Sequence, residues 1–81
     1  MDNLQKLEQL KRRAALLCEA AVAQRRTITV RIAKNGILTG TIIAAEYAGI
    51  RTTARSMIVK FKVTLACGPN KTERVVYVER I

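Results

Sequence analysis

The first third of the chain repeats apolar residues at the spacing of an α-helix. Between Leu4 and Gln24 there is no glycine or proline, and apolar residues recur at steps of three and four. This spacing puts them on one helical face, which comprises Leu7, Leu10, Ala14, Leu17 and Ala21. Asp2 with Gln5 three positions later resembles a capping box. We therefore predict an N-terminal helix within residues 1–26.

From Thr27 the pattern changes to an alternation of apolar and polar residues rich in Thr, Val and Ile, which is typical of β-strands. Four stretches show it, separated by turn-forming residues: Ile28–Ile32, Leu38–Ala44, Met57–Cys67 and Val75–Val78. The alternation predicts an antiparallel meander of four to five strands over residues 27–81. The fold class is therefore α+β, mostly β: one domain, residues 1–81, with a helix followed by a small, strongly bent barrel.

The register of the first hairpin can be predicted, because residues opposite each other in an antiparallel pair share a face. A two-residue Asn35-Gly36 loop would set Ile32 against Thr39 and mix the core face with the surface face. A three-residue loop, Lys34 to Gly36 with a left-handed glycine, sets Ile32 against Leu38, and we predict this glycine-bulge hairpin. The same register pairs Val30 with Gly40 and Ile28 with Ile42.

Gly40 lies inside the second predicted strand, where it has no side chain to pack. In a small barrel such a glycine marks a bend or a close approach of another backbone. We therefore expect the strand to curl at this position.

Composition limits the functions that the chain can have. Its 81 residues suffice for one modest core, and they include no histidine and only two cysteines, Cys18 and Cys67. Both cysteines are interpreted as small buried residues, since their spacing fits neither a disulfide scaffold nor a zinc site. Isolated acids and the missing histidine argue against catalysis. We expect no enzyme activity, catalytic residue, metal, cofactor or small-molecule substrate.

The N-terminus lacks the basic segment and apolar core of a signal peptide, and no apolar run approaches the about 20 residues of a membrane span. We expect a cytoplasmic protein that does not interact with membranes.

Charge changes the picture most, because 15 Lys and Arg against six Asp and Glu leave a formal net charge of +9. This excess favours a polyanionic partner, RNA or DNA, held through its phosphates. The candidate contacts are clustered basic residues and one turn residue: Lys11, Arg12, Arg13, Arg25, Arg26, Arg31, Asn35, Lys60 and Lys62. For any one cluster, a solvated face with no partner is the alternative.

The apolar face of the helix has two interpretations. It can pack on the protein's own sheet, or Leu7, Leu10 and Leu17 can contact a second subunit. The sequence does not decide between them.

The first hairpin resembles the Sm-like family, in particular its bacterial RNA chaperone branch, Hfq. The matching stretch is Val30 to Ile42, and the positions that match the turn and the bent second strand of the family are Asn35, Gly36, Leu38 and Gly40. The resemblance implies an RNA-binding homo-oligomeric ring, formed by edge-to-edge strand pairing. The last strand then contributes to the interface, through Val76 and Val78.

The sequence departs from that family at two places. The hairpin glycines are one residue closer together than in Hfq, and Val78-Glu79 follows Tyr77 where Hfq has Lys-His. SH3-like, Tudor-like and OB-like barrels also carry such a hairpin and remain alternatives. Two other functions stay open: a DNA-binding accessory protein of plasmid or phage type, and a protein-interaction or inhibitor module that docks through the helix face.

Overall fold

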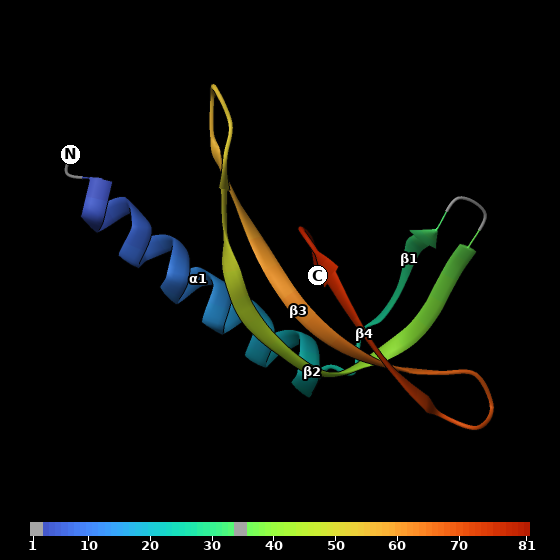
Figure 1. Cartoon of the computed structure of the whole chain (residues 1–81). Helices are drawn as coiled ribbons and strands as arrows, with labels where there is room; N and C mark the ends of the chain where they lie inside the picture. The colour runs from blue at the N-terminus through green and yellow to red at the C-terminus, as the bar shows by residue number, and fades with distance from the viewer. Residues whose placement is uncertain (1–2, 34–35) are drawn as a thin grey trace.

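The computed structural model describes residues 3–33 and 36–81, and it changes from helix to sheet where the sequence pattern changes (Figure 1). One helix precedes four antiparallel strands. The elements are α1 (Asn3–Ala23), β1 (Thr27–Ala33), β2 (Gly36–Thr52), β3 (Met57–Cys67) and β4 (Thr72–Val78). The mostly β, α+β fold is confirmed, and β3 has the predicted bounds. The cap predicted at Asp2 lies outside the described residues.

The four strands form one sheet in which each strand pairs with the next in sequence, in the order β1-β2-β3-β4. In the described part of the chain, β1 and β4 are therefore the two edges and do not pair with each other. Figure 1 shows β2 and β3 running together as a long bent hairpin, with α1 on one side. The structure thus shows a bent open sheet, and the strands do not close into a barrel.

The predicted register of the first hairpin is wrong by two residues. Val30 lies opposite Leu38 and Ile28 opposite Gly40, whereas the prediction placed Gly40 and Ile42 there. The register shifts between Arg31 and Ala33, so the extra residue is Ile32 in the strand and not a glycine in the turn. Ile28 and Val30 stay on the core face, because a slip of two residues preserves the alternation. Ile32, predicted on the same face, is 50% exposed at the bulge. The proposed turn residues Lys34 and Asn35 lie outside the described residues.

Strand β2 contains two irregularities that the sequence pattern does not reveal. Its pairing with β3 shifts between Ile42 and Ala44 and again between Tyr47 and Gly49. Each shift is a bulge that reverses the alternation and bends the strand. Ala44, predicted on the inner face, is consequently exposed, and Ala45 packs against the core instead. Figure 1 shows the resulting curvature of β2.

The core lies between α1 and the inner face of β2 and β3. Its buried members combine small helix residues with larger strand residues: Ala14, Cys18, Ala21, Ile42, Phe61, Val63 and Leu65. The inward alternation predicted for β3 is confirmed by this set. The small helix residues let the helix approach the sheet closely, and the larger strand residues supply most of the apolar surface removed from water.

The buried face of α1 differs from the predicted one at a single position. Cys18 is 6% exposed, whereas Leu17 is 43% exposed, so the buried row runs through Ala14, Cys18 and Ala21. This row faces the sheet at steps of four and three positions, which also define a helical face. The sequence left open whether Leu17 packs on the sheet or contacts a second subunit, and in the structure Leu17 does not join the core. The predicted burial of Cys18 is confirmed.

The helix ends in a Schellman motif whose left-handed residue is an arginine. The backbone N–H of Arg26 donates to the carbonyl of Ala21 at 3.1 Å, and that of Arg25 donates to Val22, also at 3.1 Å. Arg25 has φ = 49°, a conformation that glycine adopts without the steric cost of a Cβ. The carbonyl of Arg26 then accepts a 2.8 Å bond from the Ile42 N–H, which joins the helix end to β2.

Replacing Arg25 by glycine is expected to raise the free energy of unfolding by about 0.5 kcal/mol, because the gain at a left-handed position exceeds the added flexibility of the unfolded chain. A urea melt of Arg25→Gly against wild type measures the change. Arg25→Ala is the matched control, since it removes the same side chain but retains the Cβ. A glycine variant less stable than the alanine variant would contradict the assignment of this cap.

Candidate nucleic-acid interface

The basic residues predicted as nucleic-acid contacts are accessible but do not form one continuous stripe. Within the described residues, two are half-buried, Arg26 and Lys62. Six are exposed: Lys11, Arg12, Arg13, Arg25, Arg31 and Lys60. Asn35 lies outside the described residues.

The three consecutive bases of the helix point in different directions, because successive helical residues are about 100° apart. The Nζ of Lys11 lies 5.8 Å from the centroid of the Tyr47 ring, at the distance of a cation–π contact. Arg13 lines a pocket against the β2–β3 loop. Lys11 and Arg13 therefore have different neighbours, the Tyr47 ring and the β2–β3 loop respectively.

Arg26 is used within the fold. Its Nη1 donates to the backbone oxygen of Ile81 at 3.2 Å, and its Nε donates to Oε1 of Gln24 at 2.9 Å. The bond to Ile81, three positions after β4, joins the C-terminal segment to the end of the helix, whereas the bond to Gln24 is local to that end. Arg25 is exposed and makes neither bond.

The outer face of the sheet carries Lys62 beside an exposed tyrosine. Lys62 lies opposite Tyr77 in the pairing of β3 with β4, and Tyr77 is 66% exposed. On its other side the Nζ of Lys62 forms a 3.6 Å ion pair with Glu46. Arg31 lies on β1 opposite Ile37, far along β2 from Glu46. The structure therefore does not bring Arg31 next to the lysines of β3.

Three basic residues line a pocket between the N-terminal half of α1 and the β2–β3 loop. We call it the basic pocket, and its volume is about 420 Å³. Its cations are Lys6, Arg13 and Arg55, and among the described residues no acidic side chain lines it. The remaining lining residues are Gln9, Leu10, Thr52, Thr53, Ser56 and Met57.

Local structure explains how this pocket is built. Lys6 and Arg13 are two helical turns apart and share a face with Gln9 and Leu10. Arg55 belongs to the loop between β2 and β3, opposite that face. One side of the pocket is thus a helix and the other a tight hairpin loop.

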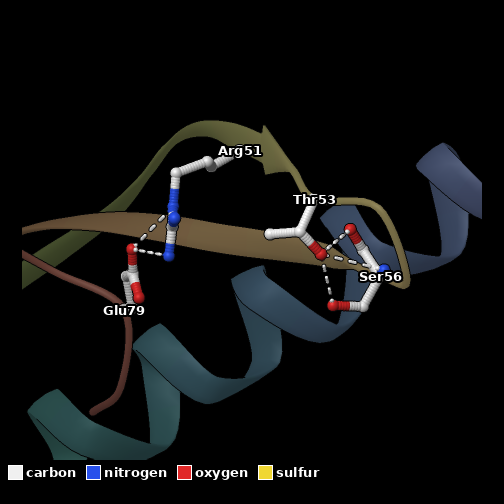
Figure 2. Close-up of polar contacts among 4 residues, drawn as sticks. All are labelled: Arg51, Thr53, Ser56 and Glu79. Carbon is white, nitrogen blue, oxygen red and sulfur yellow. Dashed lines mark hydrogen bonds and ion pairs between the residues drawn. The ribbon is translucent and has the colours of Figure 1, made fainter.

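Hydrogen bonds around Thr53 fix the hairpin loop (Figure 2). The Thr53 Oγ1 accepts from the backbone N–H of Ser56 at 3.0 Å and of Arg55 at 3.4 Å. The Thr53 N–H donates to the Ser56 carbonyl at 2.8 Å. This arrangement is typical of Thr and Ser in turns and restricts the backbone that carries Arg55.

The positive charges of the basic pocket are not compensated by ion pairs within the described residues. The ion pairs of the described residues involve other side chains. One of them joins Arg51 to Glu79 at 2.9 Å, as Figure 2 shows. Arg51 is thereby neutralised next to the pocket but outside its lining. Among the described residues, no ion pair involves Lys6, Arg13 or Arg55.

Sequence reasoning included Arg13 but missed Lys6 and Arg55. The spacing of Lys6, Gln9 and Arg13 is typical of one polar helix face, so it could have placed Lys6 beside Arg13 in the predicted site. Arg55 is 42 positions after Arg13 and carries no local signal. Only the folding of the β2–β3 hairpin along the helix brings it there.

The residues predicted at an oligomer interface are not exposed together on one surface. Val76 and Val78 are half-buried and pack against the protein's own core, and Leu7 and Leu10 are also half-buried. The more exposed apolar side chains are different ones, notably Leu16 at 65% and Val75 at 54%. Of the predicted set, Leu17 is the residue that the fold leaves exposed.

The two cysteines differ in exposure, since Cys18 is buried and Cys67 half-buried. Burial, and secondarily the carboxylate of Glu46, raises the pKa of the Cys18 thiol, so this thiol stays protonated. The described residues contain no group of three His, Cys, Asp or Glu side chains placed to hold a metal ion.

Within the part of the chain that the structure describes, no helix combines the length and the apolarity that crossing a membrane requires. Comparison of the chain with protein-family models, curated proteins and solved structures found no match.

Proposed function

We propose that this protein binds RNA as a small Sm-like β-protein of the cytoplasm, through contacts between a basic surface and phosphates. The basic pocket is the observation that carries the proposal. Three cations, two on α1 and one in the β2–β3 loop, line a cavity that contains no acidic side chain of the described residues, on a chain with a formal net charge of +9. Neutralising phosphates with such groups releases counterions and supplies most of the free energy of non-specific nucleic-acid binding.

Single-stranded RNA is preferred to duplex DNA in this proposal because an aromatic ring is accessible. Tyr77 is 66% exposed and lies opposite Lys62, so an unpaired base can stack on the ring while the lysine contacts a phosphate. Bases in a duplex are already stacked and cannot use the ring.

A homo-oligomer with closed barrels is part of the same proposal. Both sheet edges are unpaired within the described residues, and exposed backbone donors and acceptors can pair with another strand. The radius of gyration is 13.9 Å, against about 12 Å for a well-packed domain of this length. Exposed Leu16, Val75 and Ile37 also favour burial between subunits.

Fluorescence anisotropy with a labelled single-stranded RNA tests the proposal. We expect binding at about 0.1 M salt, with a slope of log K against log salt of about −2 for three neutralised phosphates on a single strand. An unlabelled single-stranded RNA should displace the label at lower concentration than a duplex DNA of the same length. Native mass spectrometry of the same sample reports the oligomeric state.

The competing results have distinct meanings. Stronger displacement by duplex DNA would favour a DNA-binding accessory protein, and no binding of either nucleic acid at this salt concentration would overturn the proposal. A strict monomer that binds RNA would retain the RNA function and remove the Sm-like ring.

A protein-interaction module is the second candidate, and one observation favours it. Leu16 and Leu17 are 65% and 43% exposed on the helix, on the side that the sheet does not cover. Adjacent exposed leucines on a helix are typical of docking surfaces for proteins. This function would leave RNA affinity undetected and would be lost in a Leu16→Ser, Leu17→Ser variant.

A further inference from the structure

We propose that the basic pocket binds a terminal phosphate monoester, the phosphorylated end of a nucleic-acid strand. The inference rests on the proposed function and makes it more specific, because it names the part of the ligand that the pocket recognises. It concerns Lys6, Arg13 and Arg55 and is independent of the stacking surface at Tyr77.

The positive charge of the basic pocket favours a phosphate monoester over a phosphodiester. A phosphate monoester carries about −1.5 to −2 charges at neutral pH, whereas a phosphodiester within a strand carries one. Within the described part of the chain the pocket gathers three cations and no acid, which is more positive charge than one phosphodiester needs. Each cation therefore interacts more strongly with a terminal phosphate than with an internal one.

The hydrogen-bond donors of the basic pocket also favour a terminal phosphate. Two of the three cations are arginines, Arg13 and Arg55, whose planar guanidinium groups can each donate two parallel hydrogen bonds to phosphate oxygens. A terminal phosphate has three non-bridging oxygens and a diester has two. The monoester can therefore accept from more of these donors at once.

The volume and the apolar lining of the basic pocket fit a nucleotide at the end of a strand. Its volume of about 420 Å³ falls within the range of about 300–1,000 Å³ of small-molecule sites, so it holds more than an isolated phosphate. Leu10 and Met57 give it apolar lining next to the cations. This combination fits a terminal nucleotide, with the phosphate on the cations and the sugar or base on the apolar side chains.

The backbone that carries the three cations is held in place by the fold itself. Lys6 and Arg13 stand on a regular helix, and the Thr53 hydrogen bonds at 3.0 and 3.4 Å fix the loop that carries Arg55. Little backbone ordering is needed when the ligand enters, and binding loses less conformational entropy as a result. A loop without such bonds would favour transient contacts along a strand.

The test compares one RNA sequence with four ends: 5′-hydroxyl, 5′-phosphate, 3′-hydroxyl and 3′-phosphate. We expect one of the two phosphorylated ends to lower Kd at least tenfold relative to its hydroxyl counterpart, at constant salt. Arg55→Ala should abolish this difference. Arg80→Ala is the matched control, because it removes an exposed arginine that neither lines the pocket nor belongs to the predicted contacts, and it should retain the difference.

Free ligands separate the sources of the phosphate. Inorganic phosphate and a nucleoside monophosphate should compete with the phosphorylated RNA only at much higher concentration than the RNA itself. Competition by the nucleoside monophosphate at the same concentration would overturn the strand-end assignment and make the pocket a mononucleotide site.

Two further outcomes distinguish the inference from the function on which it rests. Equal Kd values for hydroxyl and phosphate ends would overturn the inference and leave RNA binding intact. The absence of binding to all four RNAs would overturn both. Retention of the tenfold difference in Arg55→Ala would also exclude the pocket as its cause.

Discussion

Replacing Gly40 by valine is expected to lower the free energy of unfolding by about 3 kcal/mol. Gly40 is buried at the centre of the sheet, between Ile28 of β1 and Cys67 of β3. A Cβ at this position would lie 2.7 Å from the Cys67 Sγ and 2.8 Å from the Ala66 carbonyl oxygen. The oxygen belongs to the backbone, so relief of the clash requires two strands to separate.

Urea denaturation followed by circular dichroism measures this loss. Gly40→Ala should be destabilising to a smaller degree, because alanine introduces the Cβ without the two further methyl groups of valine. Thr41→Val is the control for a branched residue at the adjacent position of β2 and should change stability by less than about 1 kcal/mol. A Gly40→Val variant as stable as wild type would disprove the close approach at this glycine.

Reversing both arginines of the basic pocket, Arg13→Glu with Arg55→Glu, is expected to raise the Kd for single-stranded RNA at least a hundredfold. The double variant removes two contacts to phosphate and places two carboxylates where the ligand's negative charge would lie, and like charges in close contact cost several kcal/mol. Both side chains are exposed, so the fold should persist. Fluorescence anisotropy at about 0.1 M salt measures the change.

The control carries the same change of net charge elsewhere. Arg12→Glu with Arg80→Glu also reverses two exposed arginines, neither of which lines the pocket. It reports how much affinity depends on the general field of the protein. Similar losses in both double variants would show that RNA senses net charge and would remove the pocket from the interface.

Elements with a long, uninterrupted pattern could be predicted from the sequence. Apolar and polar residues alternate from Val59 to Leu65 within the predicted strand Met57–Cys67, and the structure gives β3 those bounds. The helix was predictable for the same reason. Gly40 was predictable as a special position, because a glycine among alternating strand residues seldom has a packing role of its own.

Features set by the fit between elements could not be predicted. The bulge at Ile32 and the two shifts in β2 add a residue without any distinctive residue type, so alternation alone misplaces Ala44. The exposure of Leu17 depends on how closely the helix lies on the sheet, whereas the burial of Cys18 was predicted from its residue type. Both steps of three and steps of four describe a helical face, and the facing surface decides between them.

The candidate site was predictable only in its general charge. The excess of Lys and Arg indicated a polyanionic ligand, but runs such as Lys11 to Arg13 are separated by the geometry of the helix itself. The concentrated site instead combines Lys6 and Arg13 with Arg55. Its assembly depends on the length of the β2–β3 hairpin, which reaches back along the helix to its first turns.

The sequential strand order also determines how quickly the native state is reached. Since every strand pairs with its immediate successor, the loops closed during assembly are short and the entropy lost in closing them is small. Pairing of β2 with β3 spans most of both strands and forms without any other element. The helix, although made first on the ribosome, must wait for this hairpin before its small buried row has a surface to cover. Folding kinetics should therefore be controlled by β2 and β3, with docking of the helix as the later event.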